Sequence, residues 1–298
     1  MQHHTIIGGG GTRLHVVEAG DPAAPSILFL HGLSQSWLTW DRQMRSHLAD
    51  RYRLLAMDLR GHGSSDRPGD GYDDSRAWAD DVDAAIRELE LDRPILSGWS
   101  YGPLVILDYI RHYGEKRIGG IHFIGAVTKL GSEAAAAALT PEFLAVLPRL
   151  FSTETSESVR GLDSLLHLCF TREPEASDRY TMLGFGLSVP PFVRQAMLTR
   201  VVDNDDLLPT ISKPVLITHG ALDAIVKPEM VAQHRALLPH AQIDMMPGAG
   251  HAAFWDDAAA FNKRLGAFGD EVFGLFDTIP VSRTTDEEPD RVAGASRN

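Results

Sequence analysis

The chain has 298 residues, 44% of them hydrophobic, which is typical of a soluble globular protein and enough for one large domain with an insertion or for two smaller domains. Its formal net charge is −12, and no Lys/Arg cluster forms a compact motif. This balance excludes the basic face that nucleic-acid-binding proteins normally present.

Residues 1–20 are expected to form a β-hairpin. Polar and apolar residues alternate up to Ile7, four glycines follow at 8–11, and residues 12–20 alternate again. The glycines could be taken for a phosphate-binding loop. No Lys-Ser/Thr pair follows them, however, and the next element is a strand rather than a helix, so we expect no nucleotide site here.

Further along, apolar runs alternate with segments of helical spacing. Strands are expected at 27–30, 52–57, 94–96, 121–127, 214–218 and 241–246. Helical spacing is found in the apolar run 104–110 and in two stripes, which are Trp37, Trp40, Met44 and Leu48, and Trp78, Val82, Ile86 and Leu89. This alternation predicts a parallel sheet that is covered by helices on both faces.

Residues 128–210 break the rhythm. The segment has no strong strand run, is rich in Phe, Leu and Met, and is interrupted by prolines at 141, 148, 190 and 191. It is long for one crossover connection, although a series of ordinary crossover helices is the alternative. We therefore expect 1–127 and 211–282 to form an α/β core, 128–210 a helical cap, and the polar residues 283–298 a flexible tail.

The sharpest motif is Gly98-Trp99-Ser100-Tyr101-Gly102, which lies between an expected strand and an expected helix. A serine in this position sits on a strained turn that exposes its hydroxyl at the carboxyl edge of the sheet. Small residues two positions to either side let the chains approach closely. The helix that follows directs its positive N-terminal end at the site. Ser100 is therefore the candidate nucleophile.

Together with this motif, three further segments resemble the α/β-hydrolase superfamily, in the capped serine-hydrolase branch of esterases, cofactor-free haloperoxidase-type enzymes and carbon–carbon bond hydrolases. They are 31–33 (His-Gly-Leu), 58–64 (Asp-Leu-Arg-Gly-His-Gly-Ser) and the pair of loops 220–223 and 248–251. The resemblance covers about residues 20–268. It implies the α/β-hydrolase fold, a mostly parallel central sheet flanked by helices with an inserted helical cap, and a catalytic triad in the chain order Ser, Asp, His.

The resemblance assigns the two remaining triad positions to Asp223 and His251. Serine is a poor nucleophile at its ordinary pKa, so His251 would take its proton and return it to the leaving group. Asp223 would fix the tautomer of the imidazole and stabilise its charged form. The family pattern also places an oxyanion hole on the backbone N–H groups of Leu33 and Tyr101.

Other distinctive residues are expected to be structural. His31 has the position of a strand-end residue and His62 that of a turn residue, although His62 could also line the pocket. Pro103 departs from the small residue usual in the family, but the first helical turn tolerates proline, which should stiffen the elbow. The remaining histidines share no metal-binding spacing, so neither a metal site nor a cofactor is expected; they include His3, His4, His112, His122, His167, His219 and His240.

Cysteine content and apolar patterning indicate the compartment and the partners. The one cysteine, Cys169, allows no intrachain disulfide and no cysteine-based metal site. No apolar run approaches the length of a membrane span, and residues 1–11 lack a signal pattern. We expect a cytoplasmic protein that acts on a small molecule without nucleic acid or membrane, and the oligomeric state stays open.

Three functions compete. The first is hydrolysis of a small to medium, largely apolar ester through an acyl-enzyme at Ser100. The second is carbon–carbon bond hydrolysis or cofactor-free perhydrolysis on the same triad. The third is a non-catalytic ligand-binding protein, against which the complete Ser-His-Asp set argues. A dehalogenase or an epoxide hydrolase would need aspartate in place of Ser100. Adjacency and cap position suggest six pocket residues, namely Trp37, Trp99, Phe143, Phe185, Val226 and Phe254.

Overall fold

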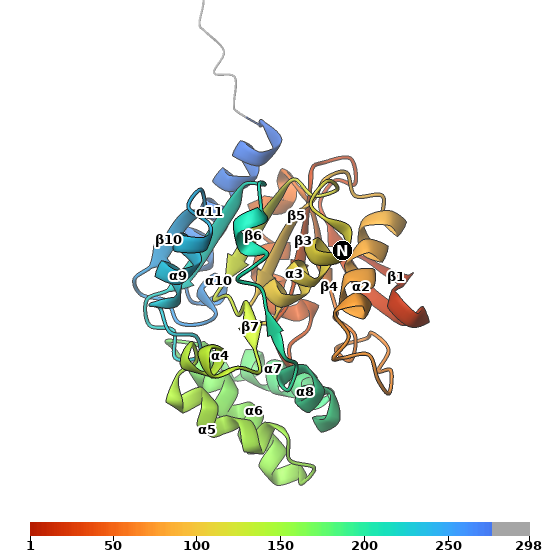
Figure 1. Cartoon of the computed structure of the whole chain (residues 1–298). Coiled ribbons are helices and arrows are strands. Elements are labelled where there is room, and N and C mark those ends of the chain that lie inside the picture. Colours follow the sequence, from red (N-terminus) through yellow and green to blue (C-terminus); the bar gives the residue numbers. More distant parts are fainter. Residues whose placement is uncertain (276–298) are drawn as a thin grey trace, which may run out of the picture.

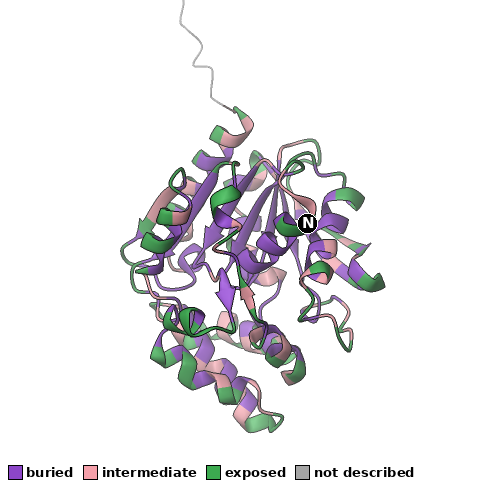
Figure 2. Cartoon of the chain, in the orientation of Figure 1, coloured by how far each residue is buried: buried purple, intermediate pink, exposed green. Residues whose placement is uncertain are grey.

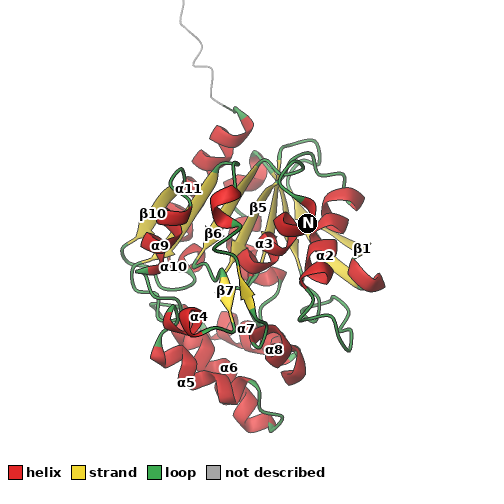
Figure 3. Ribbon diagram, viewed as in Figure 1, coloured by secondary structure: helices red, strands yellow, loops and turns green. Residues whose placement is uncertain are grey.

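A computed structural model describes residues 1–275 and shows an eight-stranded sheet flanked by helices (Figures 1 and 3). The strand order is β1-β2-β4-β3-β5-β6-β9-β10, with antiparallel pairs up to β4 and parallel pairs from there on. The strands are β1 (Gln2–Ile7), β2 (Arg13–Ala19), β3 (Ser26–Leu30), β4 (Arg53–Met57), β5 (Ile95–Trp99), β6 (Gly120–Ile124), β9 (Val215–Gly220) and β10 (Gln242–Met246). The expected tail, 283–298, and the end of the expected core, 276–282, lie outside the described residues.

The central strands are buried on both faces. Every residue of β3, β5 and β6 is buried (Figure 2), which explains why these strands appear in the sequence as continuous apolar runs. At the sheet edge, β1 and β2 form the expected hairpin around the glycine segment. The prediction of a mostly parallel sheet with flanking helices is confirmed.

Helices lie on both faces of the sheet. On one face α2 (Ser75–Glu88) packs against α3 (Gly102–Tyr113), and both are seen in front of the strands in Figure 1. The second group consists of α1 (Asp41–Met44), α10 (Ala253–Asp256) and α11 (Ala258–Phe273), which contact one another. A further helix, α9 (Met230–Leu237), connects β9 to β10. Within residues 1–275, no helix is both long and apolar enough to cross a membrane.

The stripe from Trp37 to Leu48 forms three short pieces instead of one helix. They are η2 (Trp37–Trp40), α1 and η3 (His47–Asp50). The side chain of Ser46 accepts a hydrogen bond from the backbone N–H of Leu48, which begins a new turn and interrupts the helix. Helical spacing therefore predicted the buried side of this segment correctly, but it did not predict that the backbone forms three short pieces.

Between β6 and β9 the chain forms a layer of helices, which we call the cap. Its helices are α4 (Glu133–Ala137), α5 (Pro141–Leu150), α6 (Thr155–Cys169), α7 (Ala176–Leu187) and α8 (Pro191–Leu198). The two short strands β7 (Lys129–Leu130) and β8 (Val202–Asp203) pair with each other and not with the main sheet. Figure 1 shows the cap on one side of the sheet, below the ends of the strands.

The base of the cap is closed by polar contacts. The ammonium group of Lys129 pairs with Asp205 at 2.5 Å, and the side-chain amide of Asn204 donates to the backbone carbonyl of Thr128 at 3.0 Å. Both contacts join the chain that enters the cap to the chain that leaves it. Further backbone hydrogen bonds attach the cap to the loops of the core, from Thr140 to Ile225 (3.0 Å) and from Ala252 to Cys169 (2.8 Å).

Candidate active site

Ser100 lies on a sharp turn between β5 and α3 with a φ of +59°. This value is uncommon for a residue other than glycine and stores backbone strain. Two backbone hydrogen bonds tie the turn to the end of β6: the N–H of Ser100 donates to the carbonyl of Ile124 (2.9 Å), and the N–H of Val127 donates to the carbonyl of Ser100 (3.0 Å). The neighbouring strand thus holds the strained conformation in place.

The glycines on either side of the turn are required by close packing. A Cβ at Gly98 would lie 2.7 Å from the carbonyl carbon of Gly102, and a Cβ at Gly102 would lie 2.5 Å from the carbonyl oxygen of Leu30. Real Cβ atoms do not approach backbone this closely, so neither position accepts a side chain. Pro103 falls in the first turn of α3, where its missing N–H has no intrahelical partner to lose.

Two buried histidines brace the loop that follows β3. His31 accepts a hydrogen bond at Nε2 from the N–H of Leu59 (3.0 Å) and donates from Nδ1 to the carbonyl of Gly32 (2.8 Å). His62 accepts at Nε2 from the N–H of Ser34 (3.2 Å). Burial, and then the nearby His31, lower the pKa of His62 to about 3, which keeps it a neutral acceptor. Both are structural, as expected, and they hold the loop instead of lining the pocket.

This loop lies directly above the nucleophile. A Cβ at Gly32 would meet the Cβ of Ser100 at 3.0 Å. The next backbone N–H, that of Leu33, and the N–H of Tyr101 donate to no acceptor within residues 1–275. Two unused N–H groups beside a serine hydroxyl are the arrangement that can stabilise a developing oxyanion.

Asp223 and His251 meet on the loops that follow β9 and β10. Nδ1 of His251 donates to Oδ2 of Asp223 at 2.8 Å, while Oδ1 accepts from the backbone N–H groups of Ile225 (2.8 Å) and Val226 (2.9 Å). Burial alone would raise the pKa of Asp223. The charge of His251 and hydrogen bonds from His219 and His251 outweigh it, so this pKa is lowered well below its ordinary range. A charged Asp223 fixes the hydrogen of His251 on Nδ1 and leaves the lone pair on Nε2.

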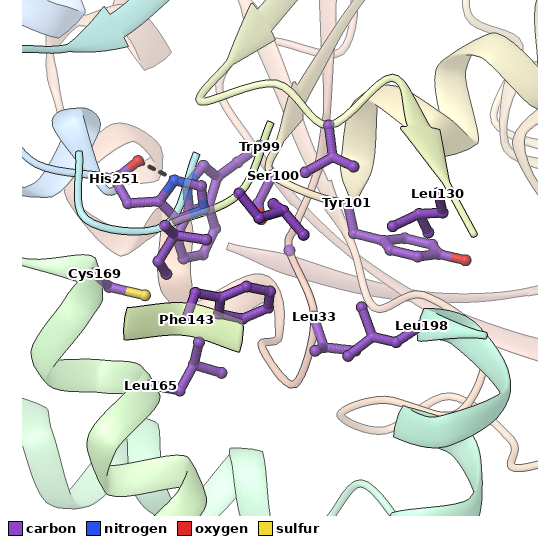
Figure 4. Close-up of a pocket in the computed structure, with 14 residues that line it drawn as sticks. Leu33, Trp99, Ser100, Tyr101, Leu130, Phe143, Leu165, Cys169, Leu198 and His251 are labelled. Atoms are coloured by element: carbon purple, nitrogen blue, oxygen red, sulfur yellow. Dashed lines mark hydrogen bonds between the residues drawn. The ribbon is translucent and has the colours of Figure 1, made fainter. Parts of the chain in front are cut away.

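That lone pair is free and faces the cavity. Nε2 of His251 is buried and has no hydrogen-bond partner among the described residues. His251 and Ser100 line one cavity (Figure 4), although no hydrogen bond joins them. The backbone carbonyl of His251 accepts from the indole N–H of Trp99 at 2.9 Å, which attaches the histidine loop to the residue before the nucleophile. A serine–histidine hydrogen bond commonly tightens only when substrate binds.

The cavity around these groups is apolar. Among residues 1–275, no Asp, Glu, Lys or Arg lines it; its walls are Gly32, Leu33, Trp99, Ser100, Tyr101, Val127, Leu130, Leu139, Phe143, Leu165, Cys169, Leu198, Ile225 and His251. The hydroxyl of Tyr101 is engaged by Arg200, whose Nη1 donates to it at 2.9 Å. Burial raises the pKa of the Cys169 thiol, which therefore stays protonated.

Among the six pocket residues suggested by the sequence, Trp99 and Phe143 line the cavity. The other four do not. The ring of Phe254 packs edge-on against Trp99, behind the cavity wall. Val226 is buried in the turn that follows Asp223. Trp37 packs against the ring of His3, and Phe185 packs against the apolar core of the cap. Adjacency to Ser100 located Trp99, whereas adjacency to Asp223 and His251 did not locate lining residues, because Val226 and Phe254 point away from the cavity.

Sequence reasoning missed most of the cavity wall. Besides Phe143, five of its residues come from the cap and its connections, namely Leu130, Leu139, Leu165, Cys169 and Leu198. Each is apolar with ordinary helical or strand spacing, so nothing in the sequence distinguishes it from a residue of the core. Only the packing of α5, α6 and α8 over the sheet edge identifies them.

Comparison with known proteins agrees with this geometry. The sequence model of the family described as "alpha/beta hydrolase fold" matches residues 25–258. The esterase RhEst1 from Rhodococcus sp. ECU1013 has a similar structure, with a TM-score of 0.87 and 32% identity over 91% of this chain and 100% of that one. The bifunctional esterase/perhydrolase DCH of Acinetobacter calcoaceticus is 27% identical over 87% of this chain and 96% of its own length. The 2-(acetamidomethylene)succinate hydrolase of Mesorhizobium japonicum is 26% identical over 81% of this chain and 86% of its own length.

The chain therefore belongs to the α/β-hydrolase family, and it is a hydrolase of that fold. The resemblance that rests on the segments around Ser100, Asp223 and His251 is confirmed at the level of family and fold.

Proposed function

We propose that the protein is a serine carboxylesterase that hydrolyses small to medium, neutral and largely apolar esters. The observation that carries this proposal is the free Nε2 of His251, which shares one apolar cavity with Ser100 and with the unused N–H groups of Leu33 and Tyr101. Asp223 completes the set by holding His251 from behind.

In the proposed reaction, Oγ of Ser100 attacks the ester carbonyl carbon while its proton moves to Nε2 of His251. The carbonyl oxygen becomes an oxyanion, which accepts hydrogen bonds from the N–H groups of Leu33 and Tyr101. The carbon–oxygen bond then breaks, and the alcohol leaves with the proton from Nε2. Water hydrolyses the acyl-Ser100 ester by the same steps, with His251 taking the proton from water and returning it to Ser100.

The lining of the cavity supports a neutral substrate. A carboxylate placed there would lose its hydration and find no Arg or Lys in the wall to compensate for it. This argues against a dicarboxylate such as the succinate derivative named for the Mesorhizobium relative. Apolar acyl and alcohol groups gain about 25 cal/mol for each Å² removed from water.

A panel of nitrophenyl esters from acetyl to decanoyl tests the proposal. We expect hydrolysis of the shorter uncharged esters, much weaker hydrolysis of a matched hemisuccinate ester, and a loss of turnover of ~10⁴-fold or more in Ser100→Ala. A fluorophosphonate should label Ser100, as mapped by peptide mass spectrometry. Turnover or labelling that survives Ser100→Ala would exclude this residue as the nucleophile.

A further inference from the structure

His219 occupies a position that its sequence context did not single out. It lies in β9, four residues before Asp223, and its side chain is fully buried. Its Nε2 donates to the backbone carbonyl of Val226 at 3.1 Å and lies 3.2 Å from Oδ2 of Asp223. One N–H directed at two acceptors is a bifurcated hydrogen bond.

The second acceptor is the same oxygen that holds His251. Oδ2 of Asp223 thus lies between two imidazoles, Nδ1 of His251 at 2.8 Å and Nε2 of His219 at 3.2 Å. The other oxygen, Oδ1, is held by the backbone N–H groups of the 223–226 turn. Because His219 also donates to Val226, it closes this turn and contacts the carboxylate at once.

The tautomer of His219 follows from its partners. Both groups that face Nε2 are acceptors, so Nε2 carries the hydrogen. Nδ1 is buried and has no partner among residues 1–275. The opposite tautomer would direct a lone pair at two oxygens, one of them charged, and is therefore disfavoured. Within the structure Nε2 of His219 is a fixed hydrogen-bond donor.

We propose that His219 is a positioning residue for hydrolysis, one that acts through Asp223. The inference rests on the proposed function. His219 holds Oδ2 in line with His251, and its N–H takes up part of the carboxylate charge. The first effect favours catalysis because it orients the base. The second limits how strongly Asp223 stabilises the protonated form of His251.

Other titratable groups lie near this pair. Cys169 of α6 and Asp256 of α10 interact electrostatically with one another, and Cys169 also with Asp223. His234 of α9 faces His219, and its own charged neighbours are Lys129 and Asp205. Ser100 faces His251 across the cavity. Every substitution at His219 leaves these residues in place, but it removes one of the causes that lower the pKa of His234, so the pKa of His234 should rise in all three variants alike.

Three variants distinguish the effect of the N–H donor of His219 from the effect of its ring shape. His219→Phe keeps a ring of similar size and removes the N–H. His219→Gln places an amide nitrogen near the position of Nε2, whereas His219→Asn places it near the position of Nδ1, which has no partner. The measurement is the pH profile of kcat/KM and of kcat on a short nitrophenyl ester, with the fold checked by circular dichroism and thermal melting.

We expect His219→Phe to lower kcat by about 10-fold, the effect of losing one hydrogen bond to a charged group, with KM changed by less than about 2-fold. The acidic limb of its kcat/KM profile should move to higher pH, because more of the carboxylate charge then stabilises protonated His251. His219→Gln should restore both the rate and the position of the limb. A role limited to packing would not move the limb.

The inference is overturned if folded His219→Phe keeps the wild-type limb, or if Gln is as slow as Phe. If His219→Phe does not fold, the comparison of His219→Gln with His219→Asn decides in its place. The inference then requires that His219→Gln has the higher kcat and keeps the acidic limb of the wild type. Equal behaviour of these two variants overturns it. Ser100→Ala is measured in parallel. If it retains activity, the proposed function fails; if it is inactive while the His219 variants resemble wild type, only this inference fails.

Discussion

Within the active site, the position of one hydrogen on each imidazole determines what each histidine does. His31, His62 and His251 carry the hydrogen on Nδ1, because Nε2 accepts from a backbone N–H in the first two and Asp223 faces Nδ1 in the third. His219 carries it on Nε2. The two loop histidines use Nε2 to hold the backbone, whereas His251 keeps Nε2 free. The same kind of side chain thus holds the backbone in one place and is the proposed base in another.

Asp223→Asn tests the tautomer of His251 directly. The amide would direct an N–H at Nδ1 and favour the hydrogen on Nε2, which removes the acceptor for the serine proton. We expect kcat to fall on the order of 10⁴-fold with little change in melting temperature. The measurement is steady-state hydrolysis of a short nitrophenyl ester.

Asp256→Asn is the matched control for this substitution. Asp256 accepts from the backbone N–H of Gly250 at 2.7 Å and makes no contact with the imidazole of His251. Its variant should keep most of the activity. If instead Asp223→Asn is nearly as active as wild type, another carboxylate supports the histidine, and Asp256 and Asp244 are the next to test.

The residues around Ser100, Asp223 and His251 could be singled out from sequence because chemistry requires particular residue types at particular turns. The cavity wall could not, because an apolar side chain fits a core and a pocket equally well. His219 was treated as an ordinary core histidine for a related reason. Its role depends on how the turn from Asp223 to Val226 folds back onto β9, and no spacing rule describes that turn.

Among the elements, the strands were the most predictable. Each parallel strand is a short apolar run with helical spacing or loops between, and the structure has a strand at each expected place. The segment from Trp37 to Leu48 was less predictable, because the cap at Ser46 interrupts it. The two-residue strands β7 and β8 are too short to give any pattern.

The helices of the cap should determine which esters the protein prefers. Phe143 of α5 lines the cavity, whereas Phe185 of α7 does not. We expect Phe143→Ala to shift the preference toward longer esters, because removing the ring enlarges the cavity while the groups around Ser100 stay in place. The measurement is kcat/KM across the ester series, expressed relative to the acetyl ester.

Phe185→Ala is the matched control, since it removes the same ring from the same layer of helices but away from the cavity. It should lower stability without changing the order of preference. An equal shift in both variants would mean that general loosening of the cap, and not the cavity wall, sets substrate size.

For the whole molecule, buried neutral histidines link stability to pH. Burial is the main cause that lowers the pKa of His122 to about 3 and of His234 to about 4. In the unfolded chain a histidine has its ordinary pKa of about 6.5. Between these values the unfolded state binds more protons than the folded state, so the stabilising contribution is complete above about pH 6.5 and is lost as the pH falls toward the folded pKa.

His122→Gln should reveal this contribution. His122 lies between the hydroxyls of Ser97 (3.1 Å) and Thr218 (3.0 Å), and glutamine cannot titrate there. Urea denaturation at pH 7 and pH 4.5 gives the free energy of unfolding, and wild type should lose more of it than the variant, by up to about 1.4 kcal/mol per pH unit. Comparing the two proteins cancels the pH dependence that the carboxyl groups contribute to the free energy of unfolding. Asp108 is one of these groups: burial raises its pKa to about 6, and its effect on the pH dependence has the opposite sign. Parallel pH dependence in both proteins would contradict the assignment.

The backbone strain at Ser100 has a consequence for how this protein can change over generations. A glycine there would relax the turn, so the most direct route to a more heat-resistant fold at this position deletes the hydroxyl that we propose as the nucleophile. Selection for thermal stability alone would therefore favour a substitution at this turn that abolishes activity. Retention of serine in this costly conformation has to come from selection on turnover.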